Sequence, residues 1–168
     1  ERGAEIKDNP ARHLRVRGTG DARAPFFTNE DEKRLLFELS QMSNKNHLRL
    51  TKLALATGFR RSELLNLTWR NIDLKKRIIY IHRKNCAASD NSYGLKIVPL
   101  PEKSQKILDE LSTRHGKIIE LTKGAARNGF DKARKKAGLE TLRFHDLRHI
   151  AISRMWSSGM NALEISAC

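Results

Sequence analysis

Hydrophobic residues recur with a helical period through the first third of the chain after residue 25. Residues 26–42 read FFTNEDEKRLLFELSQM. Thr28 followed by Asp31 resembles a helix-capping box, and Leu35, Leu36 and Leu39 form an apolar stripe. The pattern predicts a second helix over 46–57, which ends at Gly58 as a left-handed cap. A third helix is expected to start at Ser62 in SELLNLTW, with Trp69 as a core candidate.

The pattern then changes to short, β-branched runs. Residues 77–82 read RIIYIH and residues 95–100 read LKIVPL, and a polar, turn-rich loop joins them. This arrangement predicts a β-hairpin with a long tip. Helical periodicity returns in 104–112, 123–138 and 144–159, and a last helix is expected to open at Asn161. The predicted fold class is therefore mainly α with a small antiparallel β-hairpin or sheet.

Residues 1–25 differ from the rest because they show no apolar periodicity. Prolines, glycines and scattered arginines make this stretch typical of a linker or an arm. Its basic residues could follow a phosphate backbone, although a solvated segment is the simpler interpretation.

Charge narrows the choice of partner. The 168 residues include 33 Lys and Arg against 19 Asp and Glu, a formal net charge of +14. Such a balance favours a polyanion, most often nucleic acid, over a surface that is basic only for solubility. Residues 114–148 carry much of the excess, including Lys132, Arg134, Lys135 and Lys136, which lie either along a DNA groove or on a solvated helix face.

Other classes of protein find little support in the sequence. No apolar run is long enough to span a bilayer, and no signal peptide opens the sequence. Cys86 and Cys168 make no disulfide framework and are expected to be free thiols in a reducing compartment. No cluster of Cys and His has the spacing of a zinc site.

The segment RFHDLRH, residues 143–149, concentrates chemical groups. If it opens a helix, His145 and Arg148 share a face, while Phe144 and Leu147 can pack inward behind them. A guanidinium binds two phosphate oxygens, and an imidazole exchanges a proton near neutral pH. The pair suits a phosphodiester whose charge grows in the transition state. An ordinary helix start, with Asp or His as its cap, is the alternative.

Two further regions offer basic side chains. Arg60 lies at a corner between two predicted helices, and Glu63 is near enough to orient it; a surface arginine in a turn is the alternative. Lys84 follows the first strand of the hairpin and Lys96 begins the second. A hairpin lysine can reach over a substrate as a proton donor, although such lysines are more often simply solvated.

Taken together, these motifs resemble the tyrosine recombinases, the phage integrase family. TG-x-R-x-x-E around Arg60, a hairpin lysine and H-x-L-R-H in order are quite specific, and the resemblance covers residues 26–168. It implies the DNA breaking-rejoining catalytic fold over 26–168, incomplete at its C-terminus. NPARHL near the start looks like the junction after the family's core-binding domain, so residues 1–25 would be a linker from a missing N-terminal domain.

The resemblance also implies a mechanism of DNA strand cleavage and rejoining. A tyrosine attacks the scissile phosphate, forms a 3′-phosphotyrosyl bond and frees a 5′-hydroxyl, without metal or other cofactor. Arg60 and Arg148 would hold the non-bridging oxygens and His145 would activate or position the nucleophile. Lys84 would protonate the leaving oxygen, with Lys96 as its competitor. Glu63 and His149 would be supporting residues.

Partners and location follow from the same resemblance. It implies double-stranded DNA as the partner, a homo-tetramer on two duplexes, no membrane, and a cytoplasmic, nucleoid-associated location.

The sequence departs from the family in one respect. The family places a Leu-Gly-His-like box and then the tyrosine beyond H-x-x-R, whereas this sequence reads NALEISAC up to residue 168. Tyr80 and Tyr93 both precede HDLRH, so neither matches the nucleophile. The fragment is therefore expected to bind DNA and to lack its nucleophile. A type IB topoisomerase and a non-catalytic DNA-binding regulator are the alternatives.

Overall fold

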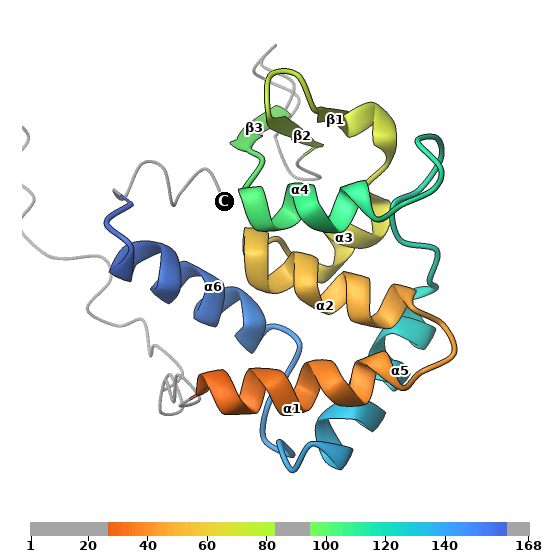
Figure 1. The fold of residues 1–168 in the computed structure, drawn as a ribbon, viewed down its shortest axis with the longest axis vertical. Helices are drawn as coiled ribbons and strands as arrows, with labels where there is room; N and C mark the ends of the chain where they lie inside the picture. The colour runs from red at the N-terminus through yellow and green to blue at the C-terminus, as the bar shows by residue number, and fades with distance from the viewer. Residues whose placement is uncertain (1–26, 83–94, 161–168) are drawn as a thin grey trace, which may run out of the picture.

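A single central helix organises the domain. The computed structural model describes residues 27–82 and 95–160. Its helices are α1 (Asn29–Ser40), α2 (Asn46–Thr57), α3 (Arg61–Asn66), α4 (Glu102–Asp109), α5 (Lys123–Lys136) and α6 (Asp146–Ser157), with a 3₁₀ turn η1 at Trp69–Asn71. Helix α2 contacts each of the other five helices. Figure 1 shows α4 and α3 on one side of it, and α1, α5 and α6 on the other.

The sheet is small and antiparallel. Its strands are β1 (Ile72–Asp73), β2 (Ile78–His82) and β3 (Leu95–Pro99), in the order β1-β2-β3. Ile79 pairs with Val98, and both are almost fully buried, so one face of the hairpin packs on the core. This result confirms the predicted fold class and adds β1, a strand too short to show an alternating pattern. Figure 1 places the sheet beyond α4, at the opposite end from α1 and α5.

Local signals set several helix ends as expected. The Thr28 hydroxyl accepts the Asp31 N–H at 3.1 Å, and the Asp31 carboxylate accepts the Thr28 N–H at 2.9 Å. This reciprocal pair is the predicted capping box at the start of α1. Gly58 ends α2 at φ +67°, and its N–H donates to the Ala54 carbonyl at 2.9 Å. Both boundaries depend on contacts within four residues, which explains why a sequence pattern can predict them.

The third helix is shorter than the sequence predicts. It ends at Asn66 because the backbone around Leu67 pairs with a distant segment instead. The Leu67 carbonyl accepts the Ile118 N–H at 3.0 Å, and the Trp69 N–H donates to the Gly116 carbonyl at 3.0 Å. These bonds to residues 116–118 replace the next helical turn. Trp69 is nevertheless buried, as expected of a core candidate.

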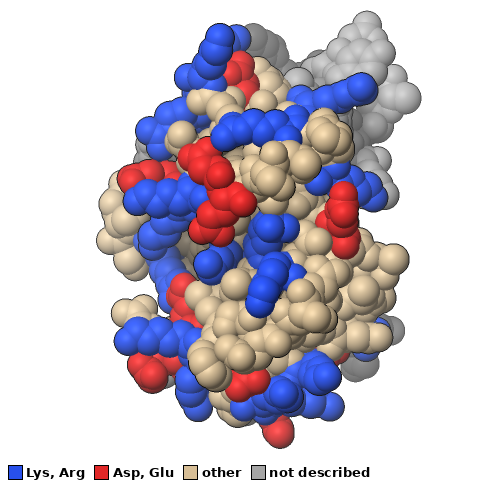
Figure 2. Space-filling model, turned by 45° about the vertical axis from the view of Figure 1, so that its right-hand side comes forward, with Lys and Arg blue, Asp and Glu red and all other residues tan. Residues whose placement is uncertain are grey.

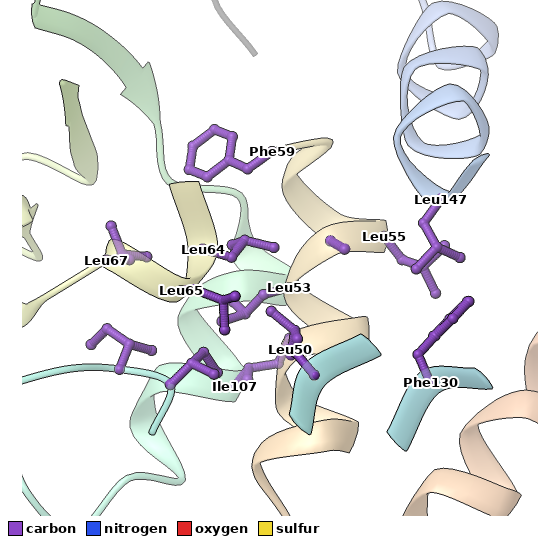
Figure 3. Close-up of a cluster of buried hydrophobic side chains, with 14 of the residues drawn as sticks. Leu50, Leu53, Leu55, Phe59, Leu64, Leu65, Leu67, Ile107, Phe130 and Leu147 are labelled. Carbon is purple, nitrogen blue, oxygen red and sulfur yellow. The ribbon is translucent and has the colours of Figure 1, made fainter. Parts of the chain in front are cut away.

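The core lies between α2 and its neighbours. Figure 3 shows Leu50, Leu53 and Leu55 of α2 among side chains from α3, α4, α5 and α6. Leu147 of α6 and Phe130 of α5 belong to this cluster and are at most 3 % exposed. The helix that begins with HDLRH is therefore held by apolar burial behind its first turn.

A second tight contact joins α2 to α5. His47, in the first turn of α2, is buried, and a Cβ added at Gly129 of α5 would lie 2.3 Å from the His47 ring. Only glycine allows the two helices to approach this closely. Burial lowers the pKa of His47, because an apolar surrounding disfavours the charged imidazole.

Among the described residues, no helix is both long and apolar enough to cross a bilayer.

Candidate active site

A cavity of about 410 Å³ lies where α5, the start of α6 and the corner between α2 and α3 meet. It brings together residues that are far apart in the sequence, including both predicted arginine motifs. Six arginines and one aspartate line it, an excess of five positive charges. The lining consists of Phe59, Arg60, Arg61, Arg127, Phe130, Asp131, Arg134, Arg143, Phe144, His145 and Arg148.

The corner between α2 and α3 positions Arg60. Phe59 is 1 % exposed and anchors the turn in the core, so that Arg60 follows as the extended N-cap of α3. The Glu63 carboxylate accepts the Arg60 backbone N–H at 2.7 Å and pairs with its guanidinium at 3.1 Å. One acidic side chain thus fixes both the backbone and the guanidinium. The Arg60 side chain remains 59 % exposed, on the cavity wall.

The first turn of α6 positions His145 and Arg148. The Asp146 side chain is 3 % exposed, and it accepts the Arg143 backbone N–H at 2.8 Å and pairs with the Arg143 guanidinium at 3.0 Å. Leu147 faces the core on the other side. With Asp146 and Leu147 turned inward, His145 and Arg148 both face the cavity, as their spacing of three residues predicts.

A direct hydrogen bond joins these two regions. Nη1 of Arg148 donates to the carbonyl oxygen of Gly58, 90 residues earlier in the chain. Ala151 and Ile152 of α6 also approach Gly58, at 3.6 and 3.7 Å from where a Cβ would stand. The end of α2 therefore holds α6 and fixes the separation between Arg60 and Arg148.

The electrostatic surroundings favour neutral His145. Its ring lies edge-on against the His149 ring, with centroids 5.1 Å apart and planes at 90°. Partial burial lowers the pKa of His145, and His149, Arg148 and Arg60 lower it further, while Asp146 acts in the opposite direction. A neutral imidazole beside fixed guanidinium groups can accept a proton while the arginines bind an anion.

The wall formed by α5 was not predicted as part of the site. Arg127, Phe130, Asp131 and Arg134 are spaced as one helix face, and all four line the cavity. Asp131 pairs with Arg134 at 2.8 Å and with Arg127 at 3.8 Å. The hydrogen bond from Arg134 is the main cause that lowers the pKa of Asp131. Periodicity could identify this face as continuous, but only the tertiary structure shows what it meets.

The structure assigns neither of the two hairpin lysines to the cavity. Lys84 lies outside the described residues. Lys96 lies in β3 opposite Ile81 and is partly buried, and it is not among the residues that line the cavity. The cavity thus brings together Arg60, His145 and Arg148, with Glu63 and His149 in contact with members of that group.

Comparison with known proteins identifies the family. The model of the phage integrase family matches residues 25–167. A shufflon-specific DNA recombinase of Escherichia coli is 31 % identical over 96 % of this chain, and an integrase of Salmonella phage P22 is 26 % identical over 88 %. The chain spans about 41 % of the length of each of these relatives.

Solved structures agree with the sequence comparison. The catalytic domain of bacteriophage HP1 integrase has a TM-score of 0.66 and 26 % identity, over 84 % of this chain and 77 % of that one. The catalytic core of lambda integrase has a TM-score of 0.63 at 18 % identity, over 84 % of this chain and 92 % of that one, which supports the fold alone. These matches confirm the resemblance seen in the motifs around Arg60 and HDLRH: the chain belongs to the phage integrase family of tyrosine recombinases.

Proposed function

We propose that this chain forms the catalytic part of a site-specific recombinase, which cuts and rejoins duplex DNA through a 3′-phosphotyrosyl intermediate. The observation that carries the proposal is the cavity in which Arg60, His145 and Arg148 meet. Two permanent cations and a titratable ring on fixed helix ends suit a phosphodiester that gains charge as it reacts. Membership of the phage integrase family supports the same chemistry.

Each residue takes one role in the proposed step. The tyrosine oxygen bonds to phosphorus while the bond from phosphorus to the 5′-oxygen breaks. Arg60 and Arg148 bind the non-bridging oxygens, and His145 accepts or orients the tyrosine proton. Lys84 gives a proton to the leaving 5′-oxygen, with Lys96 as the competing donor. Religation reverses these transfers, so the phosphodiester energy is conserved.

The supporting residues act through these groups. Glu63 orients Arg60 through its ion pair, and His149 supports the His145 ring through their edge-on contact. Neither Tyr80 nor Tyr93 is assigned as the nucleophile, because both precede the HDLRH motif.

The proposed partner is double-stranded DNA. The net charge of +14 favours it, and Figure 2 shows Lys and Arg side chains across the visible face, with acidic side chains between them. Solved structures of lambda integrase bound to DNA share the fold of this chain, which supports DNA as the partner. We further propose that the protein assembles as a homo-oligomer on its sites and works on chromosomal DNA in the cytoplasm. A type IB topoisomerase would share the chemistry, but the names of the relatives favour recombination.

The test uses the complete gene product and nicked duplexes carrying the sequence that it selects from a random pool. The nick lies just 3′ of the cleavage site, so the short fragment that bears the 5′-hydroxyl is lost after cleavage. A covalent adduct between the protein and the 3′-phosphate of the cleaved strand is therefore expected to accumulate. Lys84→Ala should slow its formation by about 100-fold or more and leave DNA affinity nearly unchanged, since a proton donor acts in the transition state. A duplex with a 5′-bridging sulfur should restore the rate, because a thiolate leaves without that proton.

The outcomes separate the assignments. If the duplex with a 5′-bridging sulfur restores the rate of Lys96→Ala but not that of Lys84→Ala, the proton donor is Lys96 of β3. An adduct on Tyr80 or Tyr93 would overturn the assignment of the nucleophile. DNA binding without any adduct would favour a non-catalytic regulator.

A further inference from the structure

The positive charge around the cavity exceeds what one phosphate requires. A phosphodiester carries one negative charge, whereas the lining has an excess of five positive charges. Three remain when Glu63 and Asp146, which pair with Arg60 and Arg143, are also counted. Like charges that line one cavity repel one another, and an anion bound among them reduces that repulsion. Arg60 and Arg148 account for the proposed scissile phosphate, so the remaining arginines need a separate explanation.

Arg127 of α5 is one of these remaining groups, and it is only loosely paired. Its side chain is 74 % exposed and, among the described residues, its ion pair is a 3.8 Å contact with Asp131. That carboxylate is already engaged by Arg134 at 2.8 Å, so Arg127 shares a partner that is largely satisfied. The guanidinium has five N–H donors in a planar fork, and this contact leaves most of them open to the cavity.

Arg143 approaches the same cavity from the start of α6. Its Nε and Nη2 groups both face the buried Asp146, and the side chain is 77 % exposed. Within residues 27–82 and 95–160, Nη1 has no hydrogen-bond partner, while the buried carboxylate holds the guanidinium in place. Arg127 and Arg143 both line the cavity, and each guanidinium is paired with a carboxylate that leaves some of its N–H donors unused.

We propose that Arg127 and Arg143 bind a second phosphate of the same DNA strand, next to the one held by Arg60 and Arg148. A strand of DNA offers phosphates at a fixed spacing, so two anchored phosphates fix the register of the strand in the cavity as well as its position. The aromatic pair Phe130 and Phe144, with ring centroids 5.1 Å apart, gives this part of the cavity a rigid wall.

This inference rests on the proposed function, because it takes the anion to be a DNA strand. The probe is thymidine 3′,5′-bisphosphate, which carries phosphates on both sides of one sugar as a strand does. Thymidine 5′-diphosphate is the comparison ligand, with two phosphates on one side only. It carries about one negative charge fewer, so the substitutions of Arg127 and Lys132 separate the effect of geometry from that of charge. The complete gene product should bind the bisphosphate about tenfold more tightly than the diphosphate, measured by isothermal titration calorimetry at low salt.

Arg127→Gln should remove that preference. Lys132→Gln is the matched control, since it removes one positive charge from an exposed position of α5 outside the cavity lining. It should keep the preference. Arg127 makes one long contact, so the substitution should leave the thermal unfolding temperature almost unchanged, which separates lost binding from lost folding.

Three outcomes decide the matter. If wild-type protein binds duplex DNA but shows no preference for the bisphosphate, or binds neither nucleotide, the second phosphate subsite is wrong and the proposed function stands. If Arg127→Gln and Lys132→Gln lower bisphosphate affinity equally, the subsite is also wrong, because the effect is one of net charge. If duplex DNA itself fails to bind at low salt, the proposed function is wrong.

Discussion

The two arginines of the candidate site are held in different ways. Arg60 is fixed by Glu63, three residues further along the same corner. Arg148 is fixed by the Gly58 carbonyl, 90 residues away. A local contact sets the direction of one side chain, but only the long-range contact sets the distance between the two guanidinium groups. The difference indicates that the geometry of the site depends more on the junction between α2 and α6 than on either motif alone.

The largest effect is expected from removing each guanidinium. Arg60→Gln and Arg148→Gln should each slow formation of the covalent adduct by on the order of 100-fold or more, because each removes transition-state charge stabilisation. Only Arg148→Gln should also lower the unfolding temperature, by about 2–4 °C, since it loses a hydrogen bond between helices. Single-turnover cleavage and thermal unfolding of both variants measure the difference. Equal unfolding temperatures would contradict the structural role of Arg148.

A smaller effect is expected from the residue that joins the two regions. Gly58→Ala puts a side chain at φ +67°, where a Cβ costs about 1–2 kcal/mol. The new methyl group would meet Ala151 and Ile152 at ordinary contact distances, so the cost is conformational rather than steric. Calorimetric unfolding should show this loss of stability. Cleavage should also be slower, because the Gly58 carbonyl that holds Arg148 would shift.

Gly124→Ala is the matched control for that substitution. It lies in the first turn of α5 with nothing within 4 Å of its added Cβ, and its φ is not positive. Alanine there should be neutral or stabilise the protein by about 0.5–1 kcal/mol. Equal destabilisation by both substitutions would show that the left-handed backbone at Gly58 is not the cause.

The smallest expected effect is on the pH dependence of cleavage, and it tests the contact between His145 and His149. Because the pKa of His145 is lowered from 6.5, the neutral ring persists below that pH, and cleavage should slow only as pH falls further through the lowered value. His149→Phe keeps a ring against His145 but removes a neighbour that lowers this pKa. The acid limb of the rate profile should therefore move to higher pH. An unchanged limb would mean that His149 does not influence His145.

Sequence patterns were sufficient wherever contacts are local. The capping box at Thr28, the left-handed cap at Gly58 and the side-by-side placement of His145 and Arg148 each depend on residues at most four apart. The family resemblance came from the same short motifs.

Features that depend on distant residues escaped sequence analysis. The third helix stops at Asn66 because the Leu67 carbonyl accepts a hydrogen bond from the Ile118 N–H. Strand β1 is too short to show an alternation of hydrophobic and polar residues. The contribution of Arg127 and Asp131 to the cavity requires knowing that α5 faces the start of α6. Charge alone singled out Lys132 and Arg134 together, although only Arg134 lines the cavity.

The contact between His47 and Gly129 restricts how this sequence can change over generations. Any side chain at position 129 would overlap the His47 ring while that ring stays in place. A lineage that first replaces His47 with a smaller residue opens room for alanine at 129, whereas the reverse order passes through an overpacked intermediate. The two positions, 82 residues apart in the chain, are therefore expected to vary as a pair, with the change at position 47 coming first.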